Sequence, residues 1–335
     1  MSAIASSPFH GLGRWWPLAA LAILVVFNVV FTPGFAALEV RDGRLFGAMV
    51  DVLKNGSIVA LLAAGMALVI GSGGIDLSVG SIMALSGTVA ALGLTSLGWP
   101  VWACVLCGLG AGALMGAFNS SLIQGVGLQP IIATLVTLVA GRGIAQTLTH
   151  DQKVRFENPS FEWIGSGALA GIPVPVVLAA GVVGLVILLL RFTVLGLYVE
   201  ALGVNPRAAR LCGLPVPRLR VAVYGASGLC AALAGLIAAA DIKEADVANC
   251  GMYAELDAIL AVVIGGTNLA GGRPRVLGAV VGALLLQTLT TSLQMRGVST
   301  EHALLVKAVV AIAVCLGQAP GLSGRWWKSR RGVTA

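Results

Sequence analysis

Apolar segments about as long as a bilayer-spanning helix follow one another along almost the whole chain. An α-helix needs roughly 20 apolar residues to cross the hydrocarbon core of a membrane, and the short polar connections leave no room for a soluble domain of ordinary size. Charged residues make up only 10% of the 335 residues, compared with roughly 25% in a soluble domain. The sequence therefore predicts an all-α, polytopic membrane protein.

The length criterion divides the chain into ten predicted transmembrane helices. They lie near 17–37, 56–73, 78–97, 100–122, 131–149, 172–190, 218–240, 255–271, 276–293 and 302–318. We expect three regions: an N-terminal segment (1–16), a transmembrane domain (17–318) with its longest connection at 191–217, and a basic tail (319–335).

Lysine and arginine are distributed unequally between the two sides of the predicted membrane domain. The connection 191–220 carries five arginines against one glutamate, and the tail after 318 is basic. The connection 241–257 on the other side carries five acidic residues against one lysine. Because positive charge stays on the cytoplasmic side, we expect both termini and the loop 191–217 to be cytoplasmic.

A metal or catalytic site is not predicted from the residue pattern. The six cysteines are scattered, and the Cys104–Cys107 pair has no second pair or histidine cluster to complete a metal site. The only hint of a serine nucleophile, Ser166 between two glycines, has no suitable histidine beside it. We therefore expect no cofactor, and an intramembrane enzyme is disfavoured.

Residues 66–81 read MALVIGSGGIDLSVGS, an apolar run broken by glycines around a single carboxylate, Asp76. Asp76 could cap the following helix, because a carboxylate there accepts unpaired backbone N–H groups. It could equally face the path of a solute, since broken helices expose backbone to a cavity. A similar glycine-rich break follows at 265–275, and the segments before the two breaks, 67–71 and 261–265, are weakly alike.

Other polar residues at membrane depth are mostly neutral. Amides and hydroxyls without many ionisable groups suit a neutral polyhydroxyl solute, whereas a proton-coupled carrier would bury more carboxylates or histidines. Arg142 is expected to reach the outer surface or to pair with an acid rather than to bind a ligand. The candidates for a translocation pathway or a helix break are Gly73, Gly74, Asp76, Ser78, Asn119, Thr134 and Asn268.

Glycines also recur at helical spacing. Gly108, Gly112 and Gly116 share one helix face, as do Gly278 and Gly282. Small residues at this spacing let two membrane helices approach closely, so we expect tight helix packing there rather than a binding site.

The loop 191–217 contains its own helix signal, because Asn205 followed by Pro206 is typical of a helix start. A short helix with small residues on one face can dock into a groove on a partner. The alternative is a connector that its arginines hold at the lipid headgroups.

Three separated motifs resemble one protein family. They are GGIDLSVGS at 73–81, EALGVNPRAARLCG at 200–213 and AVVIGGTNLAGGRPRVLGAVVGALLL at 261–286. Together they resemble the permease subunits of bacterial sugar-importing ABC transporters of the ribose, xylose, arabinose and galactose group, over residues 17–318. Within this group, the stretches 42–70 and 133–149 are most similar to permeases for galactofuranose.

The resemblance implies an ABC importer permease fold in the bacterial inner membrane. It also implies three partners: a cytoplasmic ATP-binding subunit, a periplasmic sugar-binding protein and a second permease subunit, either a copy or a paralogue. The coupling helix that meets the ATPase would include Glu200, Ala201, Gly203, Asn205, Ala208 and Ala209. The break 73–81 would adjoin the translocation path.

The sequence itself contains no phosphate-binding GxxxxGK[ST] loop, so ATP hydrolysis is expected on another chain and this chain is expected not to be an enzyme. Two alternatives remain open: a permease of the same type for another small solute, such as a branched-chain amino acid, and a secondary carrier.

Overall fold

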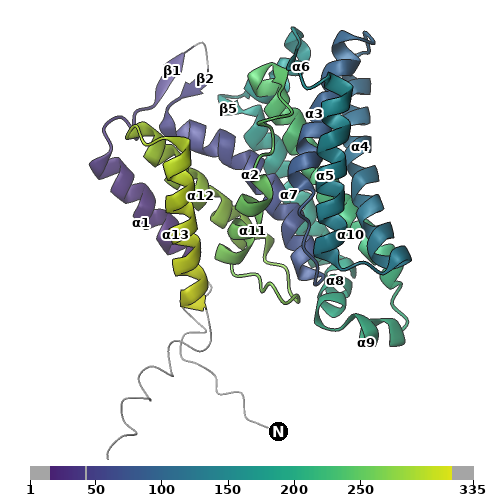
Figure 1. Ribbon diagram of the computed structural model, residues 1–335. Coiled ribbons are helices and arrows are strands. Elements are labelled where there is room, and N and C mark those ends of the chain that lie inside the picture. Colours follow the sequence, from purple (N-terminus) through teal and green to yellow (C-terminus); the bar gives the residue numbers. More distant parts are fainter. Residues whose placement is uncertain (1–15, 42–43, 319–335) are drawn as a thin grey trace, which may run out of the picture.

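The computed structural model describes residues 16–41 and 44–318, and these residues are mostly helical (Figure 1). The helices are α1 (Trp16–Phe31), α2 (Ala48–Gly71), α3 (Val79–Thr95), α4 (Val101–Ser121), α5 (Pro130–Thr149), α6 (Pro159–Ser166), α7 (Val174–Phe192), α8 (Leu195–Val204), α9 (Pro206–Leu211), α10 (Val216–Ile242), α11 (Ala254–Ile264), α12 (Val276–Met295) and α13 (Thr300–Gln318). A π-helical turn, η3 (Leu122–Val126), extends α4.

Short antiparallel strand pairs occur only in the connections of the described part of the chain. They are β1 (Glu39–Arg41) with β2 (Arg44–Phe46), β3 (Val154–Arg155) with β6 (Glu244–Ala245), and β4 (Ala168–Leu169) with β5 (Ile172–Pro173). The predicted all-α membrane fold is confirmed. The predicted segment 1–16, apart from Trp16, and the predicted tail 319–335 lie outside the described residues.

A helix occurs at each of the ten predicted spans. Within the described residues, six helices are long and apolar enough to cross a membrane, namely α2, α4 with η3, α5, α7, α10 and α12. Helices α1 and α3 are apolar but shorter, with 16 and 17 residues. The count of ten complete spans therefore stays a prediction.

The eighth predicted span, 255–271, is wrong in its second half. Helix α11 has 11 residues and ends at Ile264, so it rises only about 16 Å, roughly half of the hydrocarbon core. The glycines that follow stop the helix, since Gly266 has φ +83°, a left-handed conformation that suits glycine. The break predicted over 265–275 begins at the end of α11.

Helices α2 and α10 form the centre of the molecule. All residues of α2 from Ala60 to Gly71 are buried. Helix α10 packs against α4, α3 and α2, while α2 packs in turn against α12, α11 and α7. Helices α1, α4 and α5 lie further out and expose large apolar side chains such as Val30, Leu114 and Val139, as expected for surfaces that face lipid.

The predicted packing role of the spaced glycines is confirmed. A Cβ atom at Gly112 would lie 2.4 Å from the carbonyl oxygen of Gly228, and one at Gly116 would lie 2.2 Å from that of Tyr224. Both contacts join α4 to α10. Gly278 and Gly282 bring α12 equally close to α11 at Gly265 and Ala261.

The connections divide between the two ends of the bundle. Figure 1 shows α6 and the strand pairs at one end, and α8 and α9 at the opposite end. Helix α13 runs towards the end that carries α8 and α9. The end of the described chain and the loop 191–217 therefore lie on the same side of the molecule.

Candidate functional site

The first candidate site is the break between α2 and α3. Helix α2 ends at Gly71, and the chain turns at Gly73, which has φ +81°. Asp76 follows and is completely buried. Its carboxylate accepts hydrogen bonds from the backbone N–H of Ser78 (3.0 Å) and from the hydroxyl of Ser78 (2.6 Å). These bonds hold the chain in a turn directly before α3, which begins at Val79.

Asp76 also joins this break to two other helices. The Ser227 hydroxyl on α10 donates to Oδ2 of Asp76 (2.9 Å), and the Asn119 side chain on α4 lies 3.4 Å from Oδ1. Asn119 donates a shorter bond, 2.8 Å, to the Ser78 hydroxyl. A buried carboxylate is tolerated when donors surround it in this way. The geometry favours the interpretation of Asp76 as the residue that fixes the helix break.

Two further candidates from the sequence meet at the same place. The Thr134 hydroxyl on α5 donates to the carbonyl of Ile75 (3.2 Å). Gly74 lies against the hydroxyl of Tyr224, and a Cβ atom at Gly74 would approach that oxygen to 2.3 Å. Six of the seven predicted pathway or break residues are therefore neighbours. All of them except Gly73 are buried, so a role in lining a path stays a prediction.

The remaining candidate, Asn268, does not touch this group through its side chain. It is exposed in the second break, and its side chain accepts a hydrogen bond from the N–H of Ala270 (3.0 Å). The two breaks nevertheless meet, because the N–H of Gly272 donates to the carbonyl of Gly71 (3.0 Å). The repeated glycine-rich pattern in the sequence thus corresponds to two segments in contact.

Tyr224 and Ser227 are participants that the sequence did not single out. Both are buried polar side chains in α10, three residues apart and therefore on one helix face. This spacing within an apolar helix was the available signal. Their partners on the α2–α3 break lie about 150 positions earlier in the chain, which no local pattern indicates.

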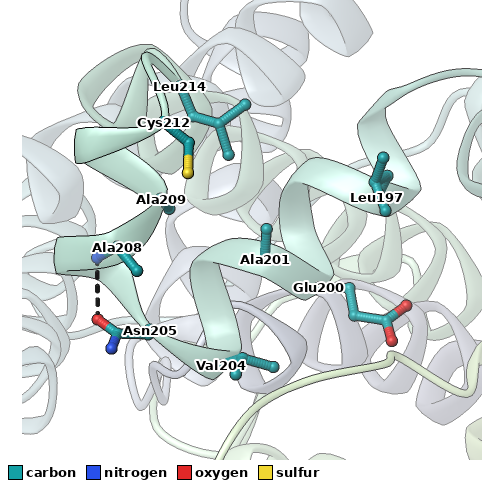
Figure 2. Close-up of a pocket in the computed structure, with 9 residues that line it drawn as sticks. All are labelled: Leu197, Glu200, Ala201, Val204, Asn205, Ala208, Ala209, Cys212 and Leu214. Atoms are coloured by element: carbon teal, nitrogen blue, oxygen red, sulfur yellow. Dashed lines mark hydrogen bonds between the residues drawn. The ribbon is translucent and has the colours of Figure 1, made fainter.

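The second candidate site is a hollow of about 370 Å³ between α8 and α9 (Figure 2). The residues that line it are Leu197, Glu200, Ala201, Val204, Asn205, Ala208, Ala209, Cys212 and Leu214. Figure 2 shows Ala201 on α8 and Ala208 on α9 facing the space between the two helices. Their small side chains leave the hollow open, and most of its lining is apolar.

Asn205 shapes this hollow. Its side chain accepts hydrogen bonds from the N–H groups of Arg207 and Ala208, both at 3.0 Å, and so caps the first turn of α9. The predicted helix start at Asn205 and Pro206 is confirmed. The predicted coupling residues all lie in this region, but Gly203 is buried on the side of α8 away from the hollow.

Arg142 lies in the second half of α5, and its side chain is partly buried. Its guanidinium donates to the backbone carbonyls of Val247 (2.6 Å) and Cys250 (3.2 Å). The side chain therefore holds the connection between α10 and α11 against α5, and both of these partners are backbone groups.

In residues 16–41 and 44–318, no group of three or more His, Cys, Asp or Glu side chains could hold a metal ion. Cys104 is buried and Cys107 is exposed, so the two sulfurs of the CxxC pair lie in different surroundings.

Comparison with known proteins places these features in context. Residues 48–315 match the family model described as branched-chain amino acid transport system / permease component. The chain is 45% identical over 309 residues to the galactofuranose transporter permease YtfT of Escherichia coli strain K12, covering 90% of each chain. It is 39% identical over 311 residues to the fructose import permease FruF of Bifidobacterium longum, covering 91% of this chain and 87% of FruF. It is 38% identical over 307 residues to the ribose import permease RbsC of Escherichia coli strain K12, covering 89% of this chain and 91% of RbsC.

Proposed function

We propose that this chain, which belongs to the branched-chain amino acid transport system permease family, is the membrane-spanning permease subunit of an ABC importer for a monosaccharide. The observation that carries the proposal is its similarity, over about 90% of its length, to permeases named for galactofuranose, fructose and ribose. The chain is a transport component, and the hydrolysis of ATP belongs to a separate subunit.

A sugar is the substrate class that the relatives favour over an amino acid. The family description mentions branched-chain amino acids, but the three relatives described above are named for sugars. The polar residues at membrane depth are chiefly amides and hydroxyls, which can exchange hydrogen bonds with sugar hydroxyls. The greater identity to the galactofuranose permease makes a furanose the first sugar to test.

The hollow between α8 and α9 supports the proposal that a separate ATPase subunit drives transport. It is open, mostly apolar and lies at the end of the bundle, with Glu200 at its edge. An apolar anchor from a partner could fill such a hollow, and we assign that partner as the cytoplasmic ATPase. Movement of the ATPase would then alternate the access of the permease to the two sides of the inner membrane.

Two further partners complete the proposed importer. A periplasmic sugar-binding protein would deliver the substrate at the end of the bundle that carries α6 and the strand pairs. A second permease subunit, either a copy of this chain or a paralogue, would complete the translocation path. Both termini would face the cytoplasm.

The test measures ATP-driven sugar uptake in proteoliposomes. They contain this chain together with the ATPase, the binding protein and the second permease that are encoded beside it. We expect sugar uptake that requires both ATP and the binding protein. Uptake by the permease alone would contradict the proposal, because it would indicate a secondary carrier.

The docking site can be tested with Glu200→Arg. We expect the variant to reach the membrane but to lose sugar-stimulated ATP hydrolysis by about tenfold or more, because a reversed charge at the edge of the hollow opposes docking. Glu157→Arg is the matched control, since Glu157 is exposed and lies just before α6, which is at the other end of the bundle (Figure 1). Normal assembly and normal stimulated hydrolysis in Glu200→Arg would contradict the assignment of this hollow.

A further inference from the structure

Gly203 lies where three separate segments of backbone meet. It is in the last turn of α8, and a Cβ atom there would lie 1.9 Å from the carbonyl oxygen of Gly71 and 2.5 Å from the nitrogen of Gly272. Both distances are far below van der Waals contact. The backbone of α8 therefore touches the end of α2 and the second break directly, with no side chain between them.

The neighbouring glycines complete the same junction. A Cβ atom at Gly271 would lie 2.6 Å from the carbonyl oxygen of Gly203, and one at Gly73 would lie 3.5 Å from it. Gly71 and Gly272 are joined by a hydrogen bond of 3.0 Å. We call this contact of Gly71, Gly73, Gly203, Gly271 and Gly272 the glycine junction.

The two helix breaks that meet at the glycine junction lead into α3 and α12. The first break continues through Asp76 into α3 and is bonded to α4, α5 and α10. The second break connects the end of α11 to the start of α12, where the N–H of Arg275 donates to the Thr267 hydroxyl (3.1 Å). Ala201 is two residues before Gly203, on the other side of α8, and it lines the hollow together with Glu200.

From this arrangement we infer that Gly203 is a positioning residue that transmits movement of α8 to both helix breaks at once. Contacts between backbones are stiff, because close-packed atoms cannot be compressed. A displacement of α8 at the hollow therefore moves the start of α3 and the segment between α11 and α12 together. The inference rests on the proposed function, since the ATPase provides the displacement.

The first experiment compares Gly203→Ala with Gly225→Ala in the complete importer. Gly225 is a suitable control because it is in α10 and a Cβ atom there has no neighbour within 4 Å. For Gly203→Ala we expect the number of sugars imported per ATP hydrolysed to fall by about tenfold, within the usual range of coupling between sites. An import ratio equal to that of Gly225→Ala would overturn the inference.

A second measurement uses the unaltered importer, so it does not depend on the folding of a variant. Hydrogen exchange is compared between the ADP state and the state trapped with ATP and vanadate. We expect the exchange rates of 195–211, 71–78 and 265–275 to change together. A change in 195–211 with neither break affected, or no change in 195–211, would overturn the inference.

The two proposals can fail separately. If the unaltered importer and Gly225→Ala show no ATP-driven sugar uptake, the proposed function is wrong. If both are active and Gly203→Ala has the same import ratio, the function stands and the role of Gly203 is wrong.

Discussion

At the scale of single residues, Asp76 shows how a carboxylate can be useful inside an apolar bundle. Each donor bond to an ionised group contributes about 1.5–3 kcal/mol, while an unpaired buried charge costs much more. Asp76 receives bonds from its own turn, from α10 and from α4. Its position is therefore determined from several directions, and the break between α2 and α3 has one defined shape.

Replacing this carboxylate tests its role. We expect Asp76→Ala to lower the free energy of unfolding by about 3 kcal/mol, because the donors of Ser78, Ser227 and Asn119 lose their acceptor in a buried site. Sugar uptake should fall as well. Thermal unfolding in detergent and uptake in proteoliposomes measure the two effects.

The matched control for this prediction is Asp51→Ala, because Asp51 is an exposed carboxylate near the start of α2. If Asp76→Ala keeps the stability and the uptake of the control, neither the cap nor the pathway interpretation of Asp76 holds.

A second carboxylate, Asp246, makes the stability of the connection between α10 and α11 sensitive to pH. Burial alone would raise the pKa of Asp246, but hydrogen bonds from Asn249 and Lys153 outweigh it and hold the pKa below the usual value. A lowered pKa in the folded state gives stability that is present above the unfolded pKa, about 4. This stability is lost as the pH falls through the folded pKa.

Asp246→Asn should reveal this contribution. At pH 7 we expect the variant to be less stable by about 1 kcal/mol, a modest value because Lys153 is half exposed and screened by solvent. The difference in melting temperature from the unaltered protein should narrow below about pH 4. A difference that stays constant from pH 7 to pH 3 would contradict the prediction.

At the scale of elements, the positions of the helices could be predicted from the sequence better than their lengths. Apolar length located a helix at every predicted span, because burial in lipid or protein needs long apolar segments whatever their partners. The same criterion predicted a span that is longer than α11, since the glycines at 265–266 stop the helix without changing the apolar character of the segment.

In the candidate sites, too, some residues could be predicted from the sequence and others could not. Asp76 and the start of α9 stood out because glycines, asparagine and proline leave local signals. The partners Ser227 and Tyr224, and the position of Gly203 between two breaks, depend on contacts between segments far apart in the chain. Such contacts produce no periodic pattern, so sequence reasoning could not find them.

The packing of α4 against α10 gives a prediction at this scale. Gly116→Ala should lower the free energy of unfolding by about 1–3 kcal/mol, because the added methyl group overlaps the backbone of Tyr224 and forces the helices apart. Gly110→Ala is the control on the same helix, since a Cβ atom there has no neighbour within 4 Å. We expect it to be neutral or stabilising by up to about 1 kcal/mol. Equal effects of the two substitutions on thermal unfolding would show that close approach of these helices is unimportant.

At the scale of the whole molecule, the two ends of the bundle differ in charge and in structure. The end with α8 and α9 carries the arginine-rich connection and the hollow between the two helices, whereas the other end carries α6, the strand pairs and the acidic connection between α10 and α11. The positive-inside rule predicts that the first end is cytoplasmic. An ATPase needs cytoplasmic ATP, so the proposed function requires the same orientation.

Labelling with a membrane-impermeant maleimide decides this orientation. Cys212 is exposed at the end of α9 and Ala248 is exposed in the connection between α10 and α11. In intact right-side-out vesicles we expect a cysteine in Ala248→Cys to be labelled, and Cys212 to be labelled only after permeabilisation. Ala248→Cys is introduced into the Cys212→Ser variant, so that Cys212 does not contribute to the first measurement. Cys212→Ser alone is the control for the second measurement, because it lacks the thiol whose labelling is tested. If Cys212 were labelled from outside, α8 and α9 would face away from cytoplasmic ATP, and the hollow between them could not be the place where an ATPase drives import.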